Sequence, residues 1–133
     1  MNCKLVNLKY FNDKNSTLVA IERQMDCPFE IKRIFYIFNV SKNVIRGEHA
    51  NLNSKFFFIT LKGECKIKVD NGKEQQIFIL NNPKQGLYMD KMLWKQMYDF
   101  SEDCILLVLS NVFYDKNEYI YNYDEFLRMV NDT

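Results

Sequence analysis

The chain has 133 residues, of which 47% are hydrophobic and 15% aromatic, whereas glycine and proline number only 4 and 2. This composition predicts one globular domain over residues 1–133 and excludes the collagen-like, linker-like and disordered classes. The formal net charge is only +1, so we expect neither nucleic acid nor an anionic membrane among its partners.

The four cysteines, Cys3, Cys27, Cys65 and Cys104, are widely spaced and form no C-x-x-C pair. Metal sites usually bring their ligands in close pairs, so neither a zinc site nor a disulfide is expected from these positions. The sequence also contains no signal peptide and no apolar run of membrane-spanning length. We therefore expect a cytoplasmic protein with buried, reduced thiols.

Short apolar runs separated by Gly, Asn, Asp or Pro predict nine strands along the chain. They cover residues 4–11, 18–22, 32–39, 55–61, 65–69, 76–80, 86–89, 94–100 and 104–111. Nine strands at this spacing favour a sandwich or barrel over alternating β-α-β units. The clearest hairpin joins 65–69 to 76–80, because the Asn71-Gly72 pair readily adopts the positive φ of a tight turn.

Only the C-terminal stretch has helical periodicity. Asp115 is a suitable N-cap with Glu118 three residues later, and apolar side chains then recur every three or four residues from Tyr119 to Val130. We expect a short C-terminal helix that covers one sheet.

Two predicted strands, 56–61 and 105–109, are apolar on both faces. In a single-domain barrel the inner face fills the core, so an equally apolar outer face needs another layer or a second subunit. This pattern predicts a homodimer.

The only histidine, His49, lies in the run Arg46-Gly47-Glu48-His49-Ala50-Asn51. One histidine cannot build a histidine-rich metal site, so a catalytic His49 would act as a proton carrier; the alternative is a structural, hydrogen-bonded histidine. Alternation places His49 and Asn51 on one face, and Gly47 permits a bulge that would turn Arg46 to the same wall. Arg46 there would suit a phosphate-bearing substrate; its alternative role is a surface salt bridge with Glu48.

A second candidate stretch contains Trp94, Lys95 and Tyr98 on one predicted strand. Aromatic faces stack on bases or sugar rings, and Lys95 could neutralise a phosphate or a developing enolate. The alternative is that both aromatic side chains belong to the core.

Several motifs occur in the order found in one known family. They are the run 46–51, Gly63-Glu64-Cys65, Gly86-Leu87-Tyr88, the run 94–101, Val108-Leu109-Ser110, Tyr114-Asp115 and Tyr119-Ile120-x-x-Tyr123-Asp124-x-Phe126, with 18–22 and 31–38 before them. In this collinear pattern the chain resembles the dTDP-sugar 3,4-ketoisomerase (WxcM-like) family of the cupin superfamily over nearly its whole length.

The resemblance implies an all-β fold, a cupin-type small β-barrel (jelly roll) with a short C-terminal helix, assembled as a homodimer. It implies an isomerase that moves the keto group of dTDP-4-keto-6-deoxyglucose from C4 to C3 through an enediol, without metal or cofactor. The product would feed dTDP-3-amino-sugar biosynthesis for surface glycans such as lipopolysaccharide. His49 matches the first histidine of the family's R-G-x-H-A-H motif and is expected to be the base, and Arg46 is expected to hold the diphosphate.

The sequence departs from the family pattern at several positions. Asn51 replaces the second histidine, Lys55 replaces the usual cupin glutamate, and Lys95 and Tyr98 stand where histidines are common. No carboxylate or second imidazole remains at these positions to complete a metal cage, so a metal-free site is expected. Asn51, Lys95 and Tyr98 would then shape the sugar pocket, with Arg33 and Tyr36 as further pocket residues.

Two other functions remain open at this point. The loss of the second histidine is compatible with a non-catalytic sugar-nucleotide-binding barrel that acts beside a glycan-pathway enzyme, and an epimerase would share the same motif and barrel. The configuration of the product at C4 and the identity of the nucleotide also stay open, because no local motif specifies either.

Overall fold

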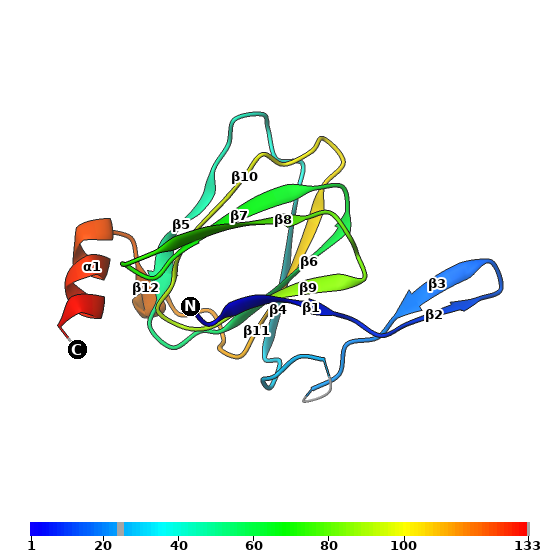
Figure 1. Ribbon diagram of the computed structural model, residues 1–133, viewed down its shortest axis with the longest axis horizontal. Coiled ribbons are helices and arrows are strands. Elements are labelled where there is room, and N and C mark those ends of the chain that lie inside the picture. Colours follow the sequence, from blue (N-terminus) through cyan, green and yellow to red (C-terminus); the bar gives the residue numbers. More distant parts are fainter. Residues whose placement is uncertain (24–25, 133) are drawn as a thin grey trace.

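The computed structural model describes residues 1–23 and 26–132. Two five-stranded antiparallel sheets face each other and form the body of the molecule, and a separate hairpin projects from one end (Figure 1). The first sheet has the order β1-β9-β6-β11-β4 and the second β12-β5-β10-β7-β8. The elements are β1 (Cys3–Asn7), β2 (Tyr10–Asp13), β3 (Ser16–Val19), β4 (Arg33–Phe38), β5 (Arg46–Asn51), β6 (Phe56–Lys62), β7 (Cys65–Asp70), β8 (Gln75–Leu80), β9 (Gln85–Met89), β10 (Trp94–Tyr98), β11 (Ile105–Ser110), β12 (Tyr119–Ile120) and the helix α1 (Tyr123–Asn131).

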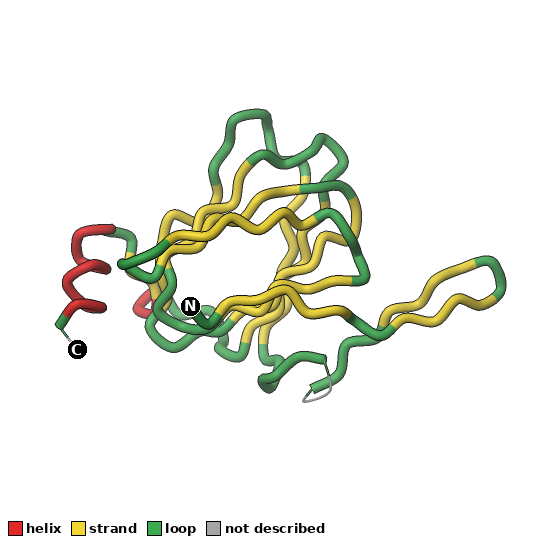
Figure 2. Tube along the Cα trace, in the orientation of Figure 1, coloured by secondary structure: helices red, strands yellow, loops and turns green. Residues whose placement is uncertain are grey.

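This architecture confirms the predicted all-β jelly roll with a short C-terminal helix, which lies at one end of the body (Figure 2). Two strands were not among the nine expected ones, namely β5 and β12. The expected strand 4–11 is divided in two at the buried Leu8, whose amide donates to the carbonyl of Lys84 and extends the β1–β9 register by one residue. The residues beyond it form β2, which pairs only with β3.

The predicted hairpin between β7 and β8 is confirmed, with Asp70 opposite Gln75 at its closed end. Gly72 adopts a φ of +94°, a conformation that a side chain would disfavour. The Asp70 carboxylate accepts a hydrogen bond from the Gly72 amide at 2.6 Å and stabilises the turn.

The expected start of the C-terminal helix was wrong. Asp115 caps only a single 3₁₀ turn over Lys116–Glu118, and α1 begins after Asn122, whose side chain accepts from the Glu125 amide at 2.9 Å. The reason is tertiary, because Tyr119 and Ile120 pair with β5 as the strand β12 and so interrupt the helical pattern. The buried side chain of Phe126 then packs α1 onto Ile120 and Ala50.

The core between the sheets contains the inward side chains of β6 and β11, such as Phe56, Phe58, Leu106 and Val108. The outer apolar face of the same strands packs against the chain's own N-terminal segment. A second cluster there contains Phe57, Ile59 and Leu109 together with Leu8, Cys27 and Phe29. Of the two expected ways to cover this face, another layer or a second subunit, the chain's own N-terminal segment provides the layer for this part of it.

Part of the outer face stays uncovered in the single chain. On the edge strand β4, the side chains of Ile34, Tyr36 and Phe38 are 61%, 63% and 54% exposed. The projecting β2–β3 hairpin adds the exposed side chains of Tyr10, Phe11 and Leu18.

All four cysteines are free and buried, as the sequence predicted. Burial raises the pKa of the Cys3 thiol to about 12, so this group stays protonated at neutral pH. No helix in the described residues is long and apolar enough to cross a membrane.

One packing contact leads to a prediction about the stability of the fold. Gly86 on β9 lies directly against the ring of Phe57, and an added Cβ would overlap that ring. Overpacking of this kind costs about 2 kcal/mol, so Gly86→Ala should lower the free energy of unfolding by that amount in urea titrations. Adding Phe57→Leu should recover part of the loss, and strictly additive losses in the double variant would contradict the proposed contact.

Candidate functional site

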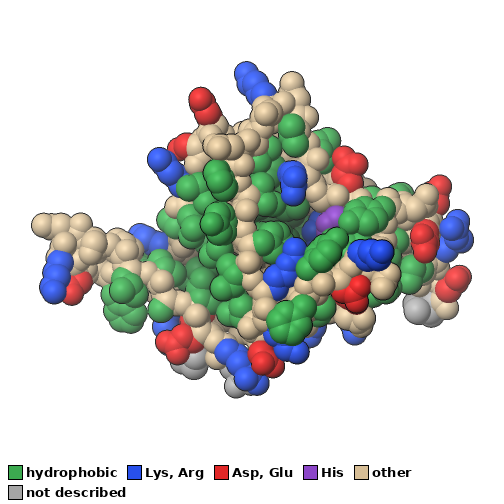
Figure 3. Space-filling view, turned by 180° about the vertical axis from the view of Figure 1, so that it is seen from behind, with side chains coloured by type: hydrophobic (Ala, Val, Ile, Leu, Met, Phe, Trp, Pro, Cys, Tyr) green, Lys and Arg blue, Asp and Glu red, His purple; other side chains and the backbone are tan. Residues whose placement is uncertain are grey.

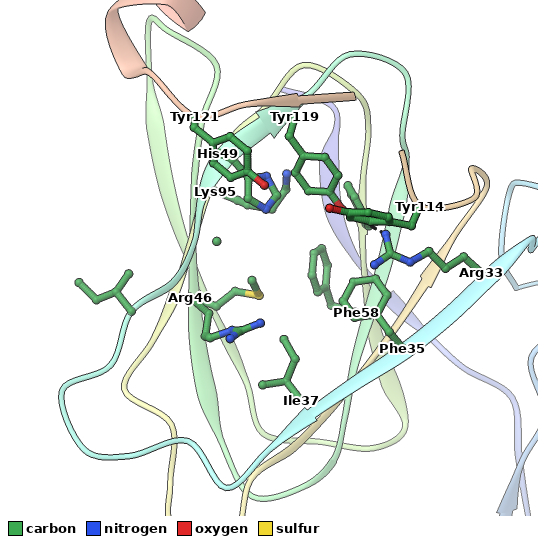
Figure 4. A pocket seen from close by; sticks show the side chains of 14 residues that line it. Arg33, Phe35, Ile37, Arg46, His49, Phe58, Lys95, Tyr114, Tyr119 and Tyr121 are labelled. Atoms are coloured by element: carbon green, nitrogen blue, oxygen red, sulfur yellow. Dashed lines mark hydrogen bonds between the residues drawn. The ribbon is translucent and has the colours of Figure 1, made fainter. Parts of the chain in front are cut away.

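A cavity of about 420 Å³ lies between the two sheets (Figure 4). Its lining comes from four strands of the body and from the segment that precedes α1. The lining side chains with polar or ring groups are Arg33, Phe35, Arg46, His49, Phe56, Phe58, Lys95, Tyr114, Tyr119 and Tyr121. The space-filling view shows the single histidine, in purple, inside a hollow bordered by basic and apolar side chains (Figure 3).

A β-bulge in β5 determines which side chains reach this cavity. His49 lies opposite Lys95 and Gly47 lies opposite Gln96, so Glu48 is an extra residue without a partner on β10. Gly47 and Glu48 both have positive φ angles, +87° and +59°. Because the extra residue reverses the alternation, Arg46 and His49 point to the same side although they are three positions apart. The predicted bulge is thereby confirmed.

Lys95 is a buried cation in the cavity lining, opposite His49 on the neighbouring strand. Its side chain is 2% exposed, and its Nζ donates a hydrogen bond to Asn51 Oδ1 at 2.9 Å. No salt bridge to Lys95 is found in the described part of the chain. Burial lowers the pKa of the Lys95 ammonium to about 7, since the charged form loses its hydration without gaining a carboxylate partner.

His49 is neutral in this environment. Burial, followed by the charge of Lys95, lowers the pKa of the imidazole to about 3. His49 Nδ1 has no hydrogen-bond partner, and neither has Asn51 Nδ2 on the same strand face. The neutral imidazole lines the cavity and is able to accept a proton from a bound molecule.

Three tyrosines that the sequence reasoning missed form the upper wall of the cavity (Figure 4). The ring centroids of Tyr119 and Tyr121 lie 4.8 and 5.7 Å from that of His49, both edge-on, and the two tyrosine rings stack at 5.7 Å. The ring of Tyr114 lies 5.8 Å from that of Tyr119. Tyr119 and Tyr121 were assigned to a helix, whereas their i, i+2 spacing is the signal of a strand that presents both rings on one face.

Arg33 connects this tyrosine wall to β4. Its Nη1 donates to the Tyr119 hydroxyl at 3.1 Å, and its guanidinium lies 5.1 Å from the ring centroid of Tyr114. Arg33 is thus held at the cavity by a hydrogen bond and an aromatic contact.

The structure brings most of the predicted site residues together. Arg33, Arg46, His49 and Lys95 line the cavity, and Asn51 lies behind them as the hydrogen-bond partner of Lys95.

Tyr36 and Tyr98 are not brought to the cavity. Tyr36 alternates with Arg33, Phe35 and Ile37, points to the outer side of β4 and stacks on Phe38. Tyr98 alternates in the same way with Met97, which lines the cavity, and so lies on the outer side of β10. These outward positions do not agree with the expectation that Tyr36 and Tyr98 contact the sugar.

The charge of the cavity favours an anionic ligand. Arg33, Arg46 and Lys95 are the charged side chains of its lining, and the lining contains no carboxylate. In the described residues, no three His, Cys, Asp or Glu side chains cluster in a way that could hold a metal ion.

Comparison with known proteins agrees with this geometry. Residues 1–131 match the model of the WxcM-like, C-terminal family. The TDP-4-oxo-6-deoxy-alpha-D-glucose-3,4-oxoisomerase of Aneurinibacillus thermoaerophilus is 38% identical over 130 residues, which cover 98% of this chain and 94% of that protein.

Two solved structures are similar over almost their entire length. WlaRA, a TDP-fucose-3,4-ketoisomerase from Campylobacter jejuni, is 55% identical with a TM-score of 0.96, covering 99% of this chain and 98% of that one. A histidine-to-asparagine variant of the 3,4-ketoisomerase QdtA from Thermoanaerobacterium thermosaccharolyticum, in complex with TDP-4-keto-6-deoxyglucose, is 38% identical with a TM-score of 0.95, covering 98% and 95%. With the family model matched along 131 residues and these relatives covering nearly the whole chain, the protein belongs to the WxcM-like family.

Proposed function

We propose that this protein is an isomerase that moves the keto group of dTDP-4-keto-6-deoxyglucose from C4 to C3. The observation that carries the proposal is a neutral His49 beside the buried cation Lys95, inside a cavity with arginines at its border. The relatives with the same fold and high coverage are 3,4-ketoisomerases and a 3,4-oxoisomerase, which supports the same reaction here.

The reaction requires the loss of hydrogen from C3 and O3 and its gain at C4 and O4. His49, neutral and in the cavity lining, removes the proton from C3, and an enediol or enediolate forms. The Lys95 ammonium stabilises the negative charge that develops on the sugar oxygens in this water-poor site. In the enediolate the O3 proton passes to O4, and His49 then returns a proton to C4. Asn51 lies behind the cavity and holds the Lys95 ammonium through its Oδ1.

The border of the cavity suits the nucleotide part of the substrate. Arg46 and Arg33 present two guanidinium groups, which bind phosphate oxygens in a bidentate manner. The stacked rings of Tyr119 and Tyr121 provide a flat aromatic surface for a pyrimidine ring. We assign the diphosphate to Arg46 and the base to the tyrosine wall.

The product, a 3-keto sugar nucleotide, is the substrate type of an aminotransferase. We place the reaction in the cytoplasm, in the synthesis of a dTDP-3-amino sugar for surface glycans such as lipopolysaccharide.

We also propose that the protein functions as a homodimer. Ile34, Tyr36 and Phe38 form an exposed apolar row on the edge strand β4. Single apolar residues are common on surfaces, but a contiguous row on an edge strand marks an interaction site.

The reaction is tested by incubating the protein with dTDP-4-keto-6-deoxyglucose in deuterated water and following C3 and C4 by NMR. We expect deuterium at C4 of the product and loss of activity of at least about 100-fold in His49→Asn, since no other imidazole exists in the chain. Tyr98→Phe, outside the cavity, serves as the control and should keep full activity. Binding of the sugar nucleotide without any exchange would instead favour the non-catalytic module that the replacement of the second histidine by Asn51 suggests.

The electrostatic coupling of His49 and Lys95 is tested by NMR titration, because a single histidine gives an unambiguous imidazole signal. The Lys95 ammonium disfavours the imidazolium, so Lys95→Met should raise the pKa of His49 above its value of about 3. Burial remains the larger cause, so the pKa should stay below the ordinary 6.5. Lys66→Met, which removes a lysine paired with Asp99 at the surface, should leave the His49 signal unchanged; an equal shift in both variants would contradict the coupling.

The dimer is tested by sedimentation at micromolar concentration. Tyr36→Asp in the middle of the β4 row should produce monomers, because burying an unpaired carboxylate in an interface is strongly unfavourable. Ile77→Asp is the matched control, since Ile77 is 53% exposed on the outer side of the other sheet. A wild-type protein that sediments as a monomer would refute the proposal.

A further inference from the structure

A buried carboxylate outside the cavity connects the tyrosine wall to the strand that carries His49. Glu118 is 9% exposed, and its carboxylate accepts four hydrogen bonds from two consecutive residues. The donors are Asn53 N and Ser54 N at 2.9 Å each, Asn53 Nδ2 at 2.9 Å and Ser54 Oγ at 2.8 Å. Asn53 and Ser54 follow β5, so Glu118 is bound to the chain just beyond Asn51.

Glu118 immediately precedes the two-residue strand β12. The β12 ladder pairs only Tyr119 with Asn51 and Ile120 with Ala50, and one further backbone bond joins the Leu52 amide to the Glu118 carbonyl at 2.9 Å. So short a ladder defines the position of a segment weakly. The four bonds of the carboxylate are therefore the main polar attachment of this segment to β5.

The hydrogen bonds are strong enough to keep this group ionised. Burial alone would raise the pKa of the Glu118 carboxyl, but the bonds from Asn53 and Ser54 outweigh it and lower the pKa below its usual range. Hydrogen bonds to an ionised acceptor are stronger than neutral ones and more demanding in direction. Glu118 thus holds the start of β12 in a defined position and orientation against Asn53 and Ser54; we call this set of four hydrogen bonds the Glu118 clamp.

Glu118 is adjacent in the chain to the side chains that contact the catalytic base, His49. Tyr119 packs edge-on against His49 and accepts a hydrogen bond from Arg33, and its neighbour Ile120 points the other way into the cluster with Phe126. A shift of β12 would move Tyr119 and Tyr121 relative to His49 and release Arg33 from the wall. Displacements of about 1 Å at a reacting centre cost on the order of 100-fold in rate.

We propose that Glu118 is a positioning residue for the isomerisation: it fixes the tyrosine wall against His49 and Arg33 without touching the substrate. This inference rests on the proposed function.

The first test compares Glu118→Ala with Glu118→Gln in steady-state kinetics. Oε1 accepts three of the four bonds, and the carbonyl oxygen of glutamine can take its place. We expect Glu118→Ala to reduce kcat/KM at least about 10-fold and Glu118→Gln to retain most of the activity. Glu125→Ala, on the exposed side of α1, is the control and should match the wild type.

The second test asks whether Glu118 acts through Tyr119. If it does, Glu118→Ala should cost little activity in a Tyr119→Ala background, so the losses in kcat/KM of the two single variants should not multiply in the double variant. A purely structural carboxylate would instead give independent losses, and multiplicative values would overturn the proposal.

A milder variant keeps the test valid if Glu118→Ala does not fold, as judged by circular dichroism. Ser54→Ala removes one donor and leaves three bonds. It should reduce kcat/KM about 2- to 5-fold, the range of one ordinary hydrogen bond, and this loss should also disappear in a Tyr119→Ala background. Activity equal to wild type in Ser54→Ala would refute the clamp. A wild-type protein without isomerase activity refutes the proposed function itself, whereas an active wild type with independent losses refutes only the role of Glu118.

Discussion

The bulge at Gly47 and Glu48 is the constraint on which the site depends. In a regular strand Arg46 and His49 would point to opposite sides, because side chains alternate with a period of two. The extra residue restores them to one face, opposite Met97 and Lys95. A Cβ at position 47 would lie 3.0 Å from the Lys95 carbonyl oxygen and the backbone there has a positive φ, so glycine is required for the cation and the base to share one cavity.

The second organising feature is a cation without a counter-ion. Lys95 is buried next to Asn51 rather than next to a carboxylate, and the same burial and charge keep His49 in its neutral form. In many buried sites such an arrangement would be only a cost in stability. In a cavity that receives an anionic sugar nucleotide it is a preformed electrostatic environment, in which the base is ready to accept a proton and the cation is ready for the negative charge of the intermediate.

The tyrosine wall shows how a structural segment becomes part of the site. The chain after β11 crosses back to β5 and adds two residues to its edge, so that one side of this short strand faces the cavity and the other packs under α1. The N-terminal segment also adds to the body of the fold, because residues around Leu8 and Phe29 cover the outer apolar face of β6 and β11. The outward side chains of β4 and those of the projecting hairpin remain exposed in the single chain.

The sequence by itself determined the all-β class, the β7–β8 hairpin, the burial of the cysteines and the bulge that unites Arg46 with His49, because each depends on local features such as alternation, an Asn-Gly turn or a glycine at a strained position. It also allowed the family to be identified from motifs in the correct order, which the comparisons confirm. Only the tertiary structure decided that Tyr119 pairs with β5 and that Tyr119 and Tyr121 contact His49, and that Glu118 binds the turn after β5. These arrangements arise between residues about 65 positions apart in the chain, and no local pattern specifies which distant strand edge a short segment will join.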